Sequence, residues 1–410
     1  MLMAEYLQLL VNHQTKTNMI GKHFFLVLII FTIIVSCKNQ SAHNVIITNT
    51  LNIPRTLETV EVAKSDLELK EDEAFENLSV RDSETKEILV SQFVDEDQDG
   101  KADILLFQPK IEANSEKNFE LVQVDESSKP KTIEYCYSRF VPERTDDYAW
   151  ENDKVGFRTY GPNAQYRFEN NLKEGTLSSG IDAWLKKVDY SIIDSWYKKY
   201  TEKTGTYHED TGEGLDNFHV GSSRGVGGIA IKQDTTFYIS KNFIEWKTIT
   251  TGPLRTSFVL DYGKWDANGQ TITETKHISL DYGSYLSRFD IEINGAESVY
   301  AGLTLHENDG EPTQNKKSGW ISYWQPHDNS ELGTAIVVPN SNMLSSELYV
   351  TNLKDRSNLY AQIKVNKGMA TYYAGFGWKE AKAFTTKEVW EAYLTDFSNK
   401  INNPLVLSYN

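Results

Sequence analysis

The sequence has 410 residues, a formal net charge of −16 at pH 7 and 12% aromatic residues. A surface this acidic repels polyphosphate and argues against a nucleic-acid binder. It also repels acidic glycans unless a local basic cluster reverses the field in one cleft. The nine Trp and 22 Tyr fit either ordinary β-sheet surfaces or sugar-binding clefts, because the C–H face of a pyranose stacks on aromatic rings.

The N-terminal segment predicts export. Residues 24–36 form a short apolar run that ends directly before Cys37, which is typical of a secretory signal followed by a bacterial lipidation site. We therefore expect residues 1–36 to be removed, with residues 1–18 an upstream start-site artefact, and a lipid on Cys37. The mature chain would be a lipoprotein in the periplasm or on the outer membrane, touching the membrane only through that lipid. Cys136 would then have no cysteine partner for an intrachain disulfide.

The rest of the chain reads as an all-β protein. Residues 37–126 alternate apolar and polar side chains and predict a small antiparallel β-domain, followed by a linker at 127–147 with one embedded strand. From residue 148 to 410, many strands separated by Gly, Asn and Asp turns predict a sandwich of large sheets. One amphipathic helix is expected at 385–401, capped by a threonine.

An acidic segment, DEDQDGKAD, places Asp95, Asp97, Asp99 and Asp103 at the spacing of a calcium loop. The EF-hand interpretation fails because its twelfth position is Leu106 instead of a bidentate glutamate. Two interpretations stay open, an acidic hairpin turn and a calcium loop of another kind. No cofactor is expected to be required, and calcium would be structural.

The segment at 207–228, YHEDTGEGLDNFHVGSSRGVGG, combines six glycines with two histidines, a tyrosine and an arginine. Glycines at this density suit a backbone that turns sharply or approaches a ligand. Zinc hydrolysis is disfavoured because the segment lacks a HExxH or CxxC pattern, and a serine nucleophile lacks the strand, elbow and helix setting. Proton abstraction beside a carboxylate remains, since it needs a base, a cation and an acid. The alternative is a polar loop whose histidines are simply hydrogen-bonded.

Two further segments carry polar side chains that we expect on one face of a strand. Arg158 lies in KVGFRTYG, downstream of Trp150 and Glu151. In SSGIDAWLKKVDY the alternation of a strand predicts that three side chains point together toward a polar region. These three are Asp182, Trp184 and Lys186. Together with the glycine-rich segment, these faces predict a cleft.

Four segments carry a family resemblance: AWENDKVGFRTYGP, SGIDAWLKKVDYSIIDSWY, YHEDTGEGLDNFHVGSSRGVGG and TGPLRTSFVLDYG. In this order they resemble the hallmarks of the bacterial family catalogued as domain of unknown function 4861, one branch of which is known as ulvan oligosaccharide dehydratases. The resemblance runs from about residue 44 onward. It implies a galactose-mutarotase-like β-supersandwich and the removal of water across C4 and C5 of a uronic acid at the non-reducing end of an oligosaccharide.

Chemistry assigns candidate roles for that reaction. A cation must neutralise the substrate carboxylate, a base must take the C5 proton, and an acid must protonate the departing C4 oxygen. The candidate cations are Arg224 and Arg158, the candidate bases are His208 and His219 with Tyr207 as an alternative, and the candidate acids are the other histidine, Tyr207 and Lys186.

Aromatic residues of GWISYWQPHD, namely Trp320, Trp324 and His327, would line sugar subsites or fill the core. Trp150, Glu151, Asp182 and Trp184 are further candidate substrate contacts. Two alternatives keep the ligand class of a uronate oligosaccharide: a polysaccharide lyase, in which a sugar leaves C4, and a glycan-binding lipoprotein without turnover. The sequence leaves the oligomeric state open.

Overall fold

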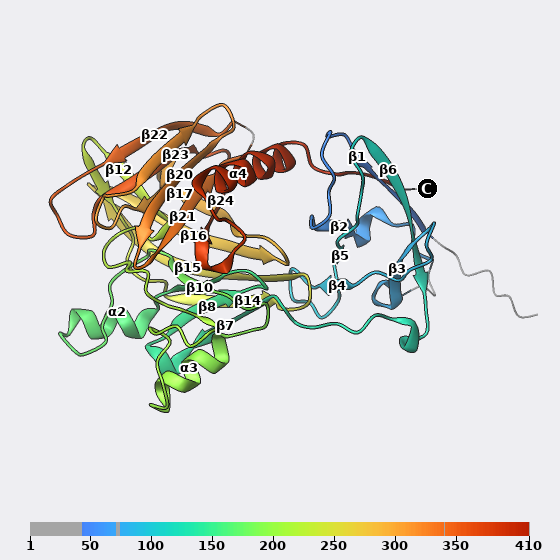
Figure 1. Ribbon diagram of the computed structural model, residues 1–410, viewed down its shortest axis with the longest axis horizontal. Helices are drawn as coiled ribbons and strands as arrows, with labels where there is room; N and C mark the ends of the chain where they lie inside the picture. Colours follow the sequence, from blue (N-terminus) through green and yellow to red (C-terminus); the bar gives the residue numbers. More distant parts are fainter. Residues whose placement is uncertain (1–42, 71–73, 340, 410) are drawn as a thin grey trace, which may run out of the picture. The chain divides into compact units, whose positions relative to one another are not determined.

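The computed structural model describes residues 43–70, 74–339 and 341–409 (Figure 1). The predicted signal segment and Cys37 lie outside these residues. Residues 44–410 form a single unit. Within the described part of the chain, we find no helix with the length and apolar character needed to cross a membrane.

The N-terminal region forms two antiparallel sheets. Strand β1 shows the predicted alternation, with every second side chain buried, and the two sheets enclose a core that includes Val45, Val80 and Phe107. The four-stranded sheet has the order β25-β1-β6-β3 and the three-stranded sheet the order β2-β5-β4. The strands are β1 (His43–Asn49), β2 (Val60–Ala63), β3 (Leu78–Asp82), β4 (Ser91–Val94), β5 (Ile104–Phe107), β6 (Ser115–Gln123) and β25 (Val406–Tyr409).

The last strand of the chain belongs to this N-terminal region. β25 pairs with β1 in antiparallel register, with Val45 opposite Tyr409. The predicted division at residue 126 stays a prediction, but this pairing carries the C-terminus across it.

A twisted five-stranded sheet with the order β11-β10-β9-β8-β7 follows. Strand β7 (Tyr137–Val141) is the one expected inside the predicted linker, so part of 127–147 belongs to this sheet. Two helices that the sequence analysis did not predict accompany this sheet, α2 (Pro162–Glu169) and α3 (Ile193–Thr201). The strands are β7 (Tyr137–Val141), β8 (Asp147–Glu151), β9 (Gly156–Thr159), β10 (Asp182–Lys186) and β11 (Gly214–Leu215).

The predicted sandwich consists of an eight-stranded sheet, in the order β14-β15-β16-β17-β24-β21-β20-β19, and a five-stranded sheet, in the order β13-β12-β18-β23-β22. Their inner faces share one core, which includes Phe258, Phe289 and Leu303. The strands are β12 (Val226–Gln233), β13 (Thr236–Tyr238), β14 (Glu245–Thr250), β15 (Arg255–Ala267), β16 (Gln270–Asp281), β17 (Leu286–Asn294), β18 (Ser298–Thr304), β19 (Glu311–Asn315), β20 (Trp320–His327), β21 (Ser330–Val337), β22 (Met343–Tyr349), β23 (Asn358–Lys364) and β24 (Met369–Trp378).

Helix α4 (Lys387–Asn402) follows the sandwich and packs on β20 and β21 (Figure 1). Thr386 caps it as predicted, because its hydroxyl accepts a hydrogen bond from the Val389 amide. Trp390 and Leu394 form its buried stripe. The predicted all-β class, with a small antiparallel β-region in front and a helix near the C-terminus, is confirmed.

Candidate functional site

The glycine-rich segment lies directly against β10. Its residues 214 and 215 form β11 and pair with Lys186 and Leu185. Gly214 and Gly225 both have positive φ, and a Cβ atom there would lie 1.8 Å from the Leu185 carbonyl oxygen and 1.9 Å from the Ile181 carbonyl oxygen. These two glycines therefore allow the segment to pack closely against β10 and the residue before it, where a side chain at either position would clash with a backbone carbonyl.

Beyond this contact, the segment forms one wall of a hollow of about 800 Å³. The hollow is lined by both polar and apolar side chains, a combination typical of small-molecule sites. Its apolar lining residues include Phe168, Leu177 and Ile239. The groups that could bind or act on a ligand are Arg158, Tyr160, His208, Asp216, Asn217, His219, Ser222, Lys241, Asp355 and Arg356. The structure thus brings together three predicted residues, Arg158, His208 and His219.

His208 is oriented by the backbone. Its Nδ1 lies 2.8 Å from the carbonyl oxygen of Asp216, and a carbonyl oxygen only accepts, so Nδ1 carries a hydrogen. In the neutral ring the lone pair is then on Nε2. Half of the side chain is exposed, which leaves an imidazole suited to accept a proton.

His219 is oriented by a carboxylate. Its Nε2 lies 3.0 Å from Oδ2 of Asp355, and 59% of its side chain is exposed. Its backbone carbonyl accepts a hydrogen bond from His306 Nε2 at 2.9 Å. The imidazolium form of His219 therefore faces an opposite charge, and a side chain from the end of β18 holds its backbone.

Arg158 lines the hollow and is 6% exposed. Its guanidinium donates to Oδ2 of Asp182, through Nε at 3.0 Å and through Nη2, and to Oδ2 of Asp216 at 3.0 Å. Its charge is already matched by these two carboxylates. The predicted role of neutralising a substrate carboxylate is corrected here: Arg158 fixes Asp216, whose carbonyl orients His208.

Burial raises the pKa of acids and tyrosines around Arg158. Burial raises the pKa of Asp147 to about 6. Burial, together with the nearby Asp216, raises the pKa of Asp182 well above its usual value. Tyr207 is only 2% exposed, and burial raises its pKa although Arg158 and Arg144 oppose this. Tyr207 therefore does not fit the predicted role of a base. Asp182, a predicted substrate contact, does not line the hollow and instead accepts hydrogen bonds from Arg158.

Arg356 is a lining residue that the sequence analysis missed. It lies in the loop between β22 and β23, is exposed, and borders the hollow. No carboxylate in the described part of the chain is within ion-pair distance of its guanidinium, whereas Lys241 pairs with Glu169 at 2.6 Å. Nothing local in the sequence marks Arg356, because only the folding of a distant loop brings it to this hollow.

Lys186 lies outside the hollow. Its Nζ is 2.7 Å from Oε2 of Glu151, and both side chains are fully buried. Glu151 also accepts hydrogen bonds from the backbone amides of Ile192 and Ile193, where α3 begins. The predicted roles, an acid for Lys186 and a substrate contact for Glu151, are corrected to a buried ion pair that joins β8, β10 and α3.

Arg224 is also outside the hollow. It is 1% exposed, and its Nη1 donates to Ser179 Oγ at 3.0 Å and to the Ile229 carbonyl at 3.2 Å. Among the described residues it has no carboxylate partner within ion-pair distance, and burial lowers its pKa. The predicted role as the substrate's cation is therefore wrong for this conformation, in which Arg224 joins β12 to the segment before β10.

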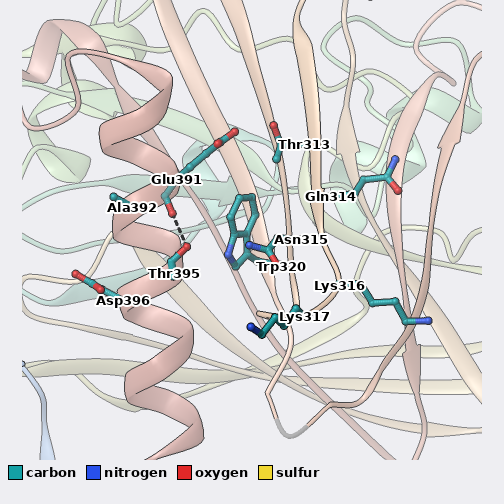
Figure 2. Close-up of a pocket in the computed structure, with 10 residues that line it drawn as sticks. All are labelled: Thr313, Gln314, Asn315, Lys316, Lys317, Trp320, Glu391, Ala392, Thr395 and Asp396. Atoms are coloured by element: carbon teal, nitrogen blue, oxygen red, sulfur yellow. Dashed lines mark hydrogen bonds between the residues drawn. The ribbon is translucent and has the colours of Figure 1, made fainter. Parts of the chain in front are cut away.

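The predicted aromatic contacts are buried. Trp150 and Trp184 are fully buried, and Trp320 and Trp324 pack in the cluster beneath α4. Figure 2 shows the side chain of Trp320, the first residue of β20, beside α4 at a separate hollow of about 700 Å³. These four tryptophans fill cores instead of forming sugar platforms in the hollow.

His327 lies beside the hollow. Its Nε2 is 2.9 Å from Oδ1 of Asn217, a lining residue. Burial, with a smaller effect of His306, lowers the pKa of His327 to about 4. The neutral ring therefore donates to Asn217, which corrects the predicted direct contact to an indirect one.

The acidic segment is the predicted hairpin turn between β4 and β5. One carboxylate oxygen from each of Asp95, Asp97 and Asp99 lies within 4.8 Å of the others. Asp103 accepts from the Glu96 amide, and both oxygens of Asp95 accept amides of the same loop, from Asp99 and Gly100. The donor atoms suit calcium, but the loop already closes through its own hydrogen bonds.

We expect calcium to have little effect on folding because these bonds form without it. Adding millimolar calcium should shift the melting temperature by less than about 1 °C, since the stabilisation grows with the ratio of ligand concentration to Kd and is small for a weakly bound ion. Differential scanning fluorimetry with EDTA as the reference measures this. A calcium-dependent rise of several degrees that disappears in Asp97→Asn would instead establish the calcium loop.

Comparisons with known proteins place the chain in a family. A protein of Formosa agariphila described as "Uncharacterized protein P7" is 60% identical over 380 residues, which covers 92% of this chain and 96% of that one. Two Enterococcus faecalis structures, a protein in glycosyl hydrolase family 38 and an α-mannosidase, are 12% identical with TM-scores of 0.49 and 0.45. Each match covers 90% of this chain, which spans about half the length of those proteins. The model of the family described as "Domain of unknown function (DUF4861)" matches residues 47–407, and the chain belongs to this family.

Proposed function

We propose that the protein is an exported dehydratase that removes water from the non-reducing-end uronic acid of an acidic, ulvan-type oligosaccharide. The observation that carries the proposal is the convergence of His208, His219 and Arg356 on one hollow. Each histidine has one ring nitrogen fixed by an acceptor, and Arg356 has a guanidinium without a carboxylate partner among the described residues. These are the base, the acid and the cation that the reaction needs.

The proposed reaction is a balanced elimination. Nε2 of His208 takes the C5 proton, the electrons of that C–H bond form the C4–C5 double bond, and the C4–O bond breaks. His219 gives a proton to the departing oxygen, so that water leaves. Arg356 pairs with the carboxylate on C5 and stabilises the charge that develops there, as guanidinium groups do through parallel hydrogen bonds.

Replacing Arg356 with alanine should lower kcat/KM for a uronate substrate by about 10- to 100-fold, because one charge-assisted pair contributes roughly 1.5–3 kcal/mol. Arg356→Lys should recover part of the loss, since lysine keeps the charge without the planar fork. Steady-state kinetics measure this. Arg81→Ala is the control, because Arg81 lies on β3 outside the hollow and pairs with Glu120, and equal losses in both variants would remove Arg356 from the site.

The reaction itself is tested with saturated uronate oligosaccharides of defined length, analysed by mass spectrometry. We expect one product that is lighter by a single water and has an unshortened chain. A shortened chain would favour a polysaccharide lyase, in which a sugar leaves C4. Binding without any change in mass would favour a glycan-binding lipoprotein.

A further inference from the structure

A second groove lies on the outer face of the eight-stranded sheet. We call it the α4 groove; its volume is about 720 Å³. The strands β15, β16, β17 and β24 contribute to it, and one side is formed by α4 residues that include Phe397 and Lys400. The segment 56–59 also lines it. The lining residues used below are Ser279, Arg288, Lys364, Thr371, Tyr373 and Lys400.

Arg288 presents hydrogen-bond donors in this groove. The register places it between Ser279 and Tyr373 on neighbouring strands, and 46% of its side chain is exposed. Its Nε lies 2.7 Å from Oδ2 of Asp290, and its Nη2 donates to Oδ1 of the same carboxylate. A guanidinium has five N–H groups, so three remain for a ligand.

The charge of the groove is opposite to that of the chain as a whole. The carboxylates that line the groove form ion pairs with arginines. Glu58 pairs with Arg55, while Glu61 and Asp281 both pair with Arg255. Neither Lys364 nor Lys400 has a carboxylate within ion-pair distance among the described residues. Because Arg255 is shared by two carboxylates, the charged lining residues carry one net positive charge, in a chain whose net charge is −16.

Aromatic and hydroxyl groups complete the lining. Tyr373 packs edge-on against Phe397 with ring centroids 5.1 Å apart and borders the groove beside Arg288. Thr371 donates to Asp290 at 2.6 Å and so fixes the carboxylate that orients Arg288. An aromatic ring next to fixed polar groups in a hollow of this size is typical of a built ligand site.

We propose that the α4 groove is a second binding site for a carboxylated oligosaccharide, distinct from the hollow at His208 and His219. The choice of this ligand class rests on the proposed function. Lys364, Lys400 and the free donors of Arg288 bind carboxylates, and Tyr373 contacts a sugar ring. The groove holds an acidic oligosaccharide chain on the enzyme between turnovers.

The test uses isothermal titration calorimetry, with a β-1,4-linked glucuronate hexasaccharide titrated into the His208→Ala variant, in which the proposed turnover is slow. We expect two sites. Adding Lys364→Gln and Lys400→Gln should weaken one of them about tenfold or more, whereas adding Arg356→Ala should weaken the other. The neutral cellohexaose should not bind the α4 groove. Melting temperatures report whether each variant is folded.

The outcomes separate this inference from the proposed function. If no uronate oligosaccharide is converted but the lysine variants lose a binding site, the α4 groove stands and the dehydratase proposal fails. If conversion occurs and the hexasaccharide binds at one site that the lysine changes leave intact, the inference about the groove is overturned. Equal binding of cellohexaose at the groove also overturns it.

Discussion

Alanine in place of His208 is expected to lower kcat/KM for a uronate oligosaccharide by about 10²–10⁴-fold, the usual contribution of a general base. The reason is the fixed orientation of the ring, in which Nδ1 is bound to the Asp216 carbonyl and Nε2 remains for the substrate. The rate of formation of the unsaturated product, followed by ultraviolet absorbance, measures the effect. The melting temperature should change little, because half of this side chain is exposed.

The control for this prediction is His277→Ala. His277 is similarly exposed and also hydrogen-bonded, to Glu292 at 2.8 Å, but it lies on β16 and does not line the hollow. Its loss should leave kcat/KM within about twofold. Near-normal turnover in the His208 variant would remove this residue from the mechanism and leave His219 as the remaining base.

Alanine in place of Lys186 is expected to destabilise the protein by about 3–5 kcal/mol, because it leaves the Glu151 carboxylate buried without its partner. Both side chains are fully buried, so water cannot replace the lost ammonium group. Urea unfolding at pH 7 measures the change in free energy. If Lys186 were instead the catalytic acid, the variant would keep its stability and lose activity.

The neighbouring residue supplies a matched control. Lys187 pairs with Asp210, and both side chains are about a quarter exposed. Lys187→Ala should therefore change the free energy of unfolding by no more than about 1 kcal/mol. Equal losses for the two lysines would show that the Lys186–Glu151 pair has no special importance for the fold.

Local patterns predicted most of the fold. The alternation in β15 and β16 is visible in the sequence and follows the burial of their side chains, and the cap of α4 was predicted from a threonine. Helix α3 was missed although Ile193, Trp196 and Tyr197 have helical spacing and are buried. Its short length hid the pattern among strands.

The site was only partly predictable. His208 and His219 were chosen as candidates because one segment concentrates polar groups, and both line the hollow. Lys186 and Trp184 were misplaced because alternation tells which side of a strand a residue faces, and not whether that side is open. Strand β10 is buried on both faces, and its supposedly polar face packs on α3. Arg356 follows His219 by 137 residues in the sequence, and only folding brings both to one hollow, so no local pattern marks it.

The central claim, that water leaves C4 of a uronate held at His208, His219 and Arg356, is tested most directly with an isotope label. The substrate is a saturated uronate oligosaccharide carrying ¹⁸O in the C4 hydroxyl of its non-reducing end. We predict an unsaturated product of unchanged chain length without the label, with the ¹⁸O released as water. A product that retains ¹⁸O, or recovery of the substrate unchanged, would contradict the account.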